Sequence, residues 1–430
     1  MKKLLLIGSA LTLISTSALA SQARLLALGM KETDNEGMYH VSDARNIFLN
    51  PAYMNIYNDY VTAEYGREGA FISKDTTGAT SSTTTLDRDN RPKAQGGFFK
   101  KQGDFVYGLY VGNESNTSSL LRIVGTSATA AINSAAGPSK MLNSADNQFD
   151  LFFGGGSDLK WGTNVTFAHG KDDSRKAKDT ALSLRTGLIG SGWDAHLNVS
   201  LASKAEAVDS VNLGGVTEVS HEFKGKLGLQ LGGSYVLSGN NRVFGYVKHY
   251  GWEQTDSSTL AATTPISATA VLGGQNGTVK GDFTSIYLGW GTHYDMNTSD
   301  KVFVSLAGKK TDINAKFATK GEVRNLVVPV TIGYEAVATE WLTLRGSVIQ
   351  NIWGQKDNKN YNSINPVGRG VITNAFGSQG KGTIVDSTEV NAGASLTFGK
   401  LVVDGLVGVK ATGALATDTL LSRAALTYNF

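Results

Sequence analysis

The sequence lacks cysteine, has little proline, and has no long apolar run beyond its N-terminus. Its 430 residues include no Cys and only 6 Pro. A chain without Cys has no disulfide framework, and it cannot carry the lipidated cysteine of a bacterial lipoprotein. A transmembrane helix needs roughly 20 apolar residues in succession, and no such run follows the N-terminus. These absences exclude disulfide-rich secreted domains and helical membrane proteins.

Net charge is also small. Lys and Arg number 40 and Asp and Glu number 37, so the formal net charge is +3. A nearly neutral chain gives no support for nucleic-acid binding. Glycine, by contrast, is abundant at 51 residues. A glycine-rich, cysteine-free chain with short apolar stretches is either a soluble all-β protein or a β-barrel.

The first twenty residues have the pattern of a secretory signal peptide. Lys2 and Lys3 precede the apolar stretches 4–7 and 10–14, and Ala18 and Ala20 are small residues at the positions that a signal peptidase reads. We expect cleavage after Ala20, and therefore an exported protein. The domains that we predict are a signal peptide (1–20), an N-terminal periplasmic or plug-like segment (21–57) and a transmembrane barrel (58–430).

Strict alternation of apolar and polar residues predicts long strands. Between residues 193 and 201 the odd positions are apolar (Trp193, Ala195, Leu197, Val199, Leu201) and the even positions are polar. A period of two places successive side chains on opposite faces of a strand. Similar runs occupy 159–167, 223–235 and 390–398. They reach about 9 to 13 residues, the length that a tilted strand needs to cross a bilayer.

Short turns alternate with long polar loops along the chain, as they do in outer-membrane barrels. The longest predicted loops are 113–146, 254–278 and 355–385. We predict an all-β fold, a transmembrane antiparallel β-barrel of about 16 strands (about 14 to 18) whose apolar face points outward to lipid. Pro329 lies inside one predicted strand and cannot donate to a ladder, so we expect a bulge there.

The chain ends on an alternating strand that closes with Tyr428 and Phe430. A last strand with a C-terminal Phe resembles the signal that Gram-negative outer-membrane barrels present to their assembly machinery. This resemblance implies the bacterial outer membrane as the location and the barrel assembly machinery as a partner. Outer-membrane lipid and lipopolysaccharide would surround such a barrel, and a homotrimer is one candidate assembly.

The N-terminal segment reaches the motif Asn50-Pro51-Ala52 just before the first predicted strand. This motif resembles the one found in the family of the long-chain fatty acid transporter FadL. The resemblance implies that a segment over 26–38 lies inside the barrel as a plug, and that the protein transports hydrophobic compounds. The remainder departs from that family, because FadL barrels have fourteen strands and an apolar interior, whereas the alternation here predicts more strands and a polar inner face.

Charged residues on the predicted inner face favour a different function. The residues that we predict to line a pore are Lys160, Arg185, Asp194, Lys224, Lys226, Glu335, Arg345, Glu389, Asp404 and Lys410. Charges on a lumen wall must be hydrated, and a barrel of this size is wide enough for water. We therefore predict a porin that passes small hydrophilic solutes, with a mild preference for anions. The FadL-like transporter is the alternative, and a structural or adhesive surface barrel is a third possibility.

An enzymatic function has little support. Asp194, His196, Asn198 and Ser200 share the predicted inner face, but residues two apart on a strand are roughly 6–7 Å apart, too far for direct hydrogen bonds. A hydrated lumen face explains them better than a catalytic site. Histidine spacing does not match a metal motif, so we predict no catalytic residue, metal or cofactor.

Overall fold

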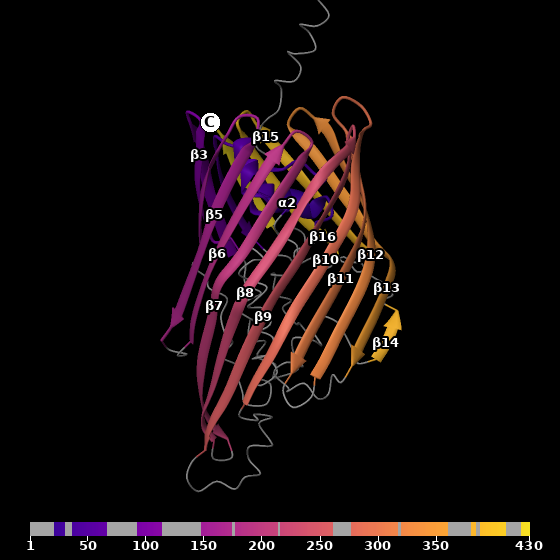
Figure 1. The fold of residues 1–430 in the computed structure, drawn as a ribbon. Coiled ribbons are helices and arrows are strands. Elements are labelled where there is room, and N and C mark those ends of the chain that lie inside the picture. The colour runs from indigo at the N-terminus through magenta and orange to yellow at the C-terminus, as the bar shows by residue number, and fades with distance from the viewer. Residues whose placement is uncertain are drawn as a thin grey trace, which may run out of the picture.

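The computed structural model describes residues 21–30, 37–66, 93–113, 148–173, 177–213, 216–260, 277–316, 320–359, 380–383, 388–409 and 423–430. These residues form a barrel that holds the N-terminal segment inside one end (Figure 1). The predicted signal peptide lies outside the described residues, as does most of each of the three long predicted loops.

The barrel wall is a closed antiparallel sheet in which each strand pairs with its neighbours in sequence. Its strands are β1 (Tyr60–Gly66), β2 (Lys93–Gln102), β3 (Phe105–Val111), β4 (Gln148–Gly155), β5 (Lys160–Asp172), β6 (Ala177–Gly190), β7 (Trp193–Leu213), β8 (Val216–Ser238), β9 (Asn241–Leu260), β10 (Gly277–Asp295), β11 (Lys301–Lys316), β12 (Lys320–Thr339), β13 (Leu342–Lys359), β15 (Thr388–Phe398), β16 (Leu401–Val409) and β17 (Arg423–Asn429). Pairing of β1 with β17 closes the sheet. The sheet has 17 strands, but β14 (Gly380–Thr383) pairs only with β13, so the wall has sixteen. The predicted fold class is confirmed.

Apolar side chains face outward, the reverse of a soluble protein. Along β1, Tyr60, Thr62 and Glu64 are buried, while Val61 and Tyr65 are exposed. The same outer face carries many further exposed apolar side chains, among them Leu197, Leu229, Leu231, Leu288, Ile332 and Leu344. An apolar outer surface of this extent is favourable in lipid, and a closed sheet leaves no open strand edge exposed to the hydrocarbon. Within the described residues no helix is long and apolar enough to cross a membrane.

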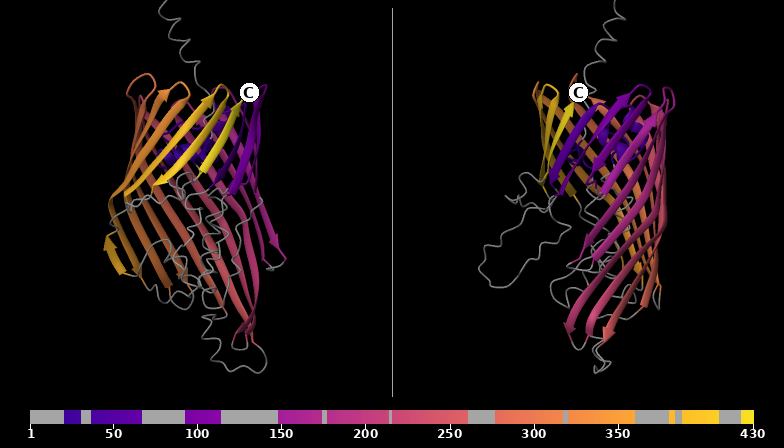
Figure 2. Two further views of the ribbon diagram at one scale, coloured as in Figure 1. Left: turned by 180° about the vertical axis from the view of Figure 1, so that it is seen from behind. Right: turned by 90° about the vertical axis from the view of Figure 1, so that its left-hand side faces the viewer.

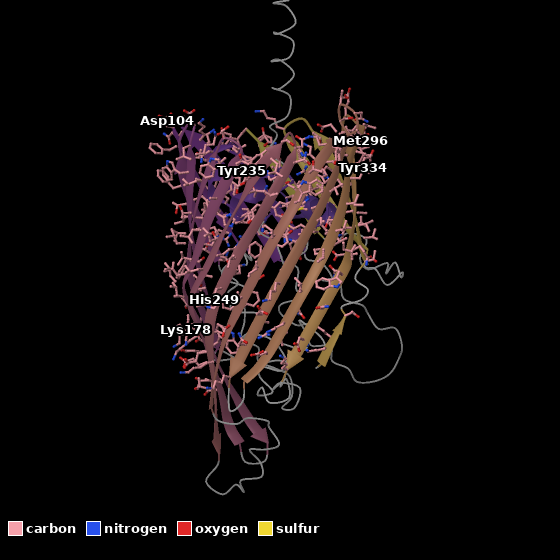
Figure 3. All side chains as sticks on the ribbon, turned by 45° about the vertical axis from the view of Figure 1, so that its right-hand side comes forward. Asp104, Lys178, Tyr235, His249, Met296 and Tyr334 are labelled. Atoms are coloured by element: carbon pink, nitrogen blue, oxygen red, sulfur yellow. The ribbon has the colours of Figure 1, made fainter. Side chains whose placement is uncertain are left out.

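Two ends of the barrel can be distinguished by their connections. The end with short turns, such as 191–192 and 399–400, also holds the C-terminus, and we call it the turn end (Figure 1). We call the opposite end the loop end. Exposed tyrosines, Tyr235 and Tyr334, lie on the outer surface near the turn end, whereas Lys178 and His249 lie toward the loop end (Figure 3). The aromatic residues fit an interfacial girdle.

The wall is much taller on one side than on the other (Figure 2). Strands β7 and β8 have 21 and 23 residues, whereas β1, β3 and β17 have 7 each. A tilted strand crosses the hydrocarbon with about 9–11 residues. The loop-end parts of the long strands therefore project beyond the apolar band, and their outer surface is charged, with ion pairs such as Lys204–Glu222 at 3.0 Å and Arg324–Glu322 at 3.0 Å.

A bulge in β8 changes which residues face the lumen. The register with β9 shifts between Gly225 and Gly228, so the alternation is inverted on the loop side of the shift. Phe223 is consequently inward and fully buried, while Lys224 and Lys226 point outward and are about half exposed. The prediction that these two lysines line a pore is wrong, and without them the inner wall loses its excess of basic residues.

The bulge predicted at Pro329 is present. The register between β12 and β13 shifts between Val328 and Pro329, because Val328 pairs with Trp353 while Pro329 pairs with Asn351. The extra residue, Ile352, belongs to the partner strand β13. A proline lacks the N–H that a regular ladder would use, and the irregular pairing accommodates it.

The N-terminal segment lies inside the barrel at the turn end. It contains the helix α2 (Gln22–Ala27) and the 3-10 helices η3 (Ala44–Phe48) and η4 (Pro51–Asn55). Each begins after a polar cap, Ser21, Asp43 and Asn50, whose side chain accepts a backbone N–H of the first turn. Helix α2 packs against β13, β15, β16 and β17, and η4 packs against β3 to β6. We call the described residues 21–30 and 37–57 the plug, since they connect opposite walls.

Candidate functional site

The motif Asn50-Pro51-Ala52 fastens the plug to the barrel wall. The Asn50 Oδ1 accepts the Ala52 N–H at 3.0 Å, and Pro51 begins the helix η4, where a missing N–H costs nothing. The Asn50 Nδ2 donates to two wall carbonyls, those of Leu188 on β6 and Ala195 on β7, both at 3.2 Å. A single side chain thus caps a helix and binds two strands.

Glycines of the inner wall make room for this motif. A Cβ added at Gly187 would lie 1.8 Å from the Asn50 Oδ1, and one added at Gly162 would lie 2.5 Å from the Pro51 carbonyl carbon. Gly393 is similarly close to Ala27 of α2, at 2.8 Å. Glycine at these inner positions allows close contact between the wall and the plug.

A side chain at Gly187 should therefore release the motif. We expect Gly187→Ala to weaken plug docking by about 1–3 kcal/mol, because Asn50 and its bonds to the wall must shift. Hydrogen exchange of residues 44–55, measured by mass spectrometry, should become faster. Gly308→Ala is the matched control, since nothing lies within 4 Å of a Cβ at Gly308. Equal exchange in the two variants would contradict the close packing of the motif.

A chain of alternating buried charges holds the plug to the opposite wall. Arg24 of α2 binds Asp43 within the plug at 2.7 Å and Glu335 of β12 at 2.9 Å. Arg345 of β13 also binds Glu335, and it binds Asp404 of β16 at 2.9 Å. All five side chains are buried. Breaking a buried ion pair is costly, so these contacts hold the plug strongly in place.

A second branch begins at the start of α2. The Ser21 hydroxyl donates to the Asp404 Oδ2 at 2.8 Å, and the Gln22 backbone N–H donates to the Glu64 Oε2 at 3.0 Å. The other oxygen of Glu64 accepts from Arg423 of β17 at 3.2 Å. Together with Glu335 of β12, these contacts place α2 among carboxylates of three wall strands, β1, β12 and β16.

The far side of the plug has its own anchors. Arg185 of β6 donates to the Phe48 carbonyl. Asp194 of β7 accepts from the Tyr53 hydroxyl at 3.3 Å and from Arg242 of β9 at 3.3 Å. Five predicted pore-lining residues, Arg185, Asp194, Glu335, Arg345 and Asp404, thus face inward but contact the plug or its immediate partners. They are buried side chains and not the hydrated pore wall that we predicted.

The other predicted residues lie away from the plug. Lys160 is at the turn end and donates to the Ser157 carbonyl of the adjacent turn at 3.0 Å. Glu389, which is half-buried, accepts from Asn391 on the same strand at 3.3 Å. Lys410 lies outside the described residues.

The two residues of the predicted assembly signal lie at the seam of the barrel. Tyr428 is exposed on β17, which pairs with both β1 and β16. The Phe430 backbone N–H donates to the Asp59 carbonyl at 3.0 Å, and the Lys100 Nζ lies 4.7 Å from the centre of the Phe430 ring. Both therefore belong to the structure that closes the sheet.

The middle of the plug packs through stacked rings. Tyr39 stacks on Phe244 of β9 at 5.1 Å and on His196 of β7 at 6.0 Å, and His40 stacks on Phe244 at 5.7 Å. Burial lowers the pKa of His40 to about 4, with a smaller contribution from His293 and Arg242. His40 is therefore neutral at neutral pH and acts as a packing ring. His196 and Asp194, two members of the polar row considered for catalysis, are engaged with the plug and its anchors.

Sequence reasoning missed an apolar surface on the inner wall. It consists of six buried residues on β8 to β12, which we call the apolar row: Phe223, Tyr250, Trp252, Phe283, Ile313 and Val323. Tyr250, Phe283, Ile313 and Val323 are direct cross-strand neighbours in succession. The rings of Tyr250 and Phe283 stack at 4.9 Å. Alternation along β9 and β10 carried the signal, but the bulge in β8 concealed that Phe223 belongs to the same row.

The apolar row lies farther from the turn end than the plug contacts do. On β9, Phe244 contacts the plug, whereas Tyr250 and Trp252 come six and eight positions later toward the loop end. Among the described residues no group of three or more His, Asp or Glu side chains is placed to hold a metal ion. The arrangement therefore places two distinct surfaces on the inner wall, the contacts to the plug and, nearer the loop end, the apolar row.

Fold and plug together define a membrane-spanning β-barrel that holds its own N-terminal segment inside one end. The chain matches no family model, and no curated protein matches its sequence. Among solved structures it is similar to the toluene transporter TbuX of Ralstonia pickettii, with 12% identity, coverage of 94% of this chain and 100% of that one, and a TM-score of 0.36. A FadL homologue of Pseudomonas aeruginosa has 12% identity, coverage of 97% and 99%, and a TM-score of 0.39. The toluene transporter TodX of Pseudomonas putida has 12% identity, coverage of 91% and 93%, and a TM-score of 0.32. Since these scores are low, function has to be inferred from this chain's own residues.

Proposed function

We propose that this protein is a channel for small hydrophobic molecules across the outer membrane, with the plug as its closure at the turn end. The observation that carries the proposal is the apolar row on the inner wall. A row of adjacent apolar side chains favours contact with apolar solutes over contact with water. A hydrophobic solute, by contrast, gains about 25 cal/mol for each Å² of apolar surface that leaves water.

The apolar row also has a shape that suits flat or chain-like solutes. Phe223 and Trp252 stack at 6.4 Å, next to the Tyr250–Phe283 pair. Ile313 and Val323 continue the same surface across β11 and β12. Ligand sites are typically apolar surfaces with a few polar groups at their edge. An adjacent polar row provides such groups.

That polar row supports a second candidate, the porin. The polar row crosses the eight strands β5 to β12, and on β9 to β12 it lies one inward-facing position nearer the turn end than the apolar row. Its members are Asn164, Arg185, Asn198, Gln230, Lys248, Ser285, Thr311 and Asn325. Every member is buried. A hydrophilic solute would use this row as its path, and the plug contacts it at Arg185.

Flux measurements distinguish the two candidates. In liposomes that contain the full chain, we expect uptake of toluene to exceed that of a sugar of similar size. The double variant Tyr250→Ser and Phe283→Ser should lower toluene flux about tenfold, since the loss of about 1.4 kcal/mol of contact has that effect. Ile286→Val, on the outer surface of the same strand as Phe283, is the control. Sugar flux equal to toluene flux, unaffected by the double variant, would favour the porin.

We also propose that the charged outer surface of the tall strands lies at the level of lipid headgroups. Lys204 and Lys224 share Glu222, and Lys226 and Lys280 approach Glu253. These cations follow directly on the apolar band, where the phosphates of lipopolysaccharide would lie. Selective loss of co-purified lipopolysaccharide from a Lys204→Gln, Lys224→Gln variant would support this placement, and unchanged lipid content would oppose it.

A further inference from the structure

The beginning of the plug is surrounded by acidic groups. Ser21 is fully buried, and its hydroxyl donates to Asp404 while accepting the Arg24 N–H at 3.0 Å. The next backbone N–H, that of Gln22, donates to Glu64 at 3.0 Å. Two different carboxylates, those of Asp404 and Glu64, therefore bind groups of Ser21 itself and of the residue that follows it.

The ion-paired groups around this point do not balance. The connected carboxylates are Asp43, Glu64, Glu335 and Asp404, and the guanidinium groups paired with them are Arg24, Arg345 and Arg423. Within the part of the chain that the structure describes, this set has four acids and three bases. An unbalanced charge in a buried network is costly, because burial removes most of the hydration that the charge has in bulk water.

A further observation agrees with a surplus of negative charge at Asp43. Burial raises the pKa of Asp43 to about 7, with Asp404 adding to this effect, although Arg24 opposes it. One more cation near Asp43 and Asp404 would stabilise the charged form of Asp43.

We propose that signal-peptide cleavage supplies this cation: the new α-ammonium group of Ser21 pairs with Asp404 and Glu64 and fastens the plug inside the barrel. The inference rests on the expected cleavage after Ala20, and it is independent of which solute the channel carries. Hydrolysis of the Ala20–Ser21 bond adds one water, leaves the new carboxylate on the signal peptide, and turns an amide nitrogen into an amine that takes up a proton. Free α-amino groups have a pKa of about 7.7–8.0, so this one is charged beside two carboxylates.

Cleavage of this one peptide bond greatly strengthens the hydrogen bonding that the Ser21 nitrogen can offer. An amide nitrogen donates one neutral hydrogen bond, whereas an ammonium group donates three that are charge-assisted, and such bonds are roughly twice as strong. With the ammonium group of Ser21 included, the network has four acidic and four basic groups. The uncleaved chain keeps the surplus carboxylate, so its plug is held less firmly. Maturation and closure of the channel are thereby linked.

The first test is the identity of the N-terminus. Mass spectrometry of the protein purified from outer membranes should show Ser21 as the first residue. A different first residue would place the ammonium group elsewhere and overturn the inference. An N-terminal serine also reacts selectively with periodate, which converts it to an aldehyde with release of ammonia and formaldehyde. In the folded protein this reaction should be at least tenfold slower than in urea.

The second test removes the charge. The mature chain is oxidised with periodate in urea and refolded, and folding is verified by its heat-modifiable migration on gels. The product lacks both the ammonium group and the hydroxyl of Ser21, so Ser21→Ala, which lacks only the hydroxyl, is the matched control. We expect hydrogen exchange of α2, residues 22–27, to be about tenfold faster in the oxidised chain than in Ser21→Ala. Equal exchange would overturn the proposal.

A charge rescue completes the design. Glu64→Gln removes one carboxylate and leaves three acids for three bases, so oxidation of that variant should accelerate exchange of α2 much less. An effect of oxidation as large as in the native sequence would show that the lost ammonium group was not balancing this network. Solute flux is not used in any of these measurements, so a failure of the transport proposal would leave the result unaffected.

Discussion

A chain that lacks residues 22–45 should conduct ions freely, whereas the full chain should show little or no current in planar bilayers. A sixteen-strand wall is wide enough for an aqueous channel, and the plug is the described element that connects its opposite sides at the turn end. The deletion removes α2 and the first two residues of η3, together with Arg24 and Asp43. Buried wall charges such as Arg345 and Asp404 would then be hydrated.

The control for this experiment is the integrity of the barrel. The deleted chain should still migrate as a heat-modifiable species, because the strands begin only at Tyr60 and close through β1 and β17. Gly187→Ala should give brief openings of the same size, since it loosens the plug without removing it. A full chain that conducts as well as the deleted chain would show that the plug is not a closure.

Much of the wall could be predicted from the sequence because lipid imposes a simple rule on it. Each strand must present apolar residues outward at every second position, so alternation identifies strands even where propensity is weak. Trp193 to Leu201 is an example, with Leu197 exposed and Asn198 buried. Pro329 indicated its bulge correctly, because a missing N–H is a property of a single residue.

The position of Lys224 and Lys226 could not be predicted in the same way. A bulge inserts residues without any residue type that signals it, and here Lys226 and Leu227 occupy the irregular stretch between Gly225 and Gly228. All positions beyond it change face. The bulge thereby concealed that Phe223 belongs to the inner apolar row, whereas the alternation along β9 and β10 carried the signal for Tyr250 and Phe283.

Whether the inward charged side chains are buried or hydrated could not be predicted from the sequence either, for a different reason. Buried arginine in an ion pair and hydrated arginine in a pore produce the same inward polar residue in a sequence, and Arg345 is consistent with both. Whether such an arginine is buried or hydrated depends on where the plug lies in the lumen. The motif Asn50-Pro51-Ala52 pointed to a plug, but the glycines that receive it, Gly162 and Gly187, are indistinguishable in sequence from other small inner residues.

Truncation of Arg345 should cause the largest loss of stability among single substitutions of wall charges. Arg345→Ala leaves Glu335 and Asp404 buried beside one another with one guanidinium group fewer, and breaking a buried pair in this way costs about 3–5 kcal/mol. The free energy of unfolding can be measured by urea titration of the barrel in lipid vesicles. Hydrogen exchange of α2 should accelerate at the same time, because Glu335 also binds Arg24.

Arg324→Ala is the matched control for this prediction. Arg324 also lies between two carboxylates, Glu322 at 3.0 Å and Asp312 at 4.0 Å, but its side chain is 50% exposed on the outer surface. Water solvates the partners that remain, so its loss should cost about 0–1 kcal/mol. Similar costs for the two variants would mean that Arg345 is hydrated in the folded protein, which would return the inner wall to the porin interpretation.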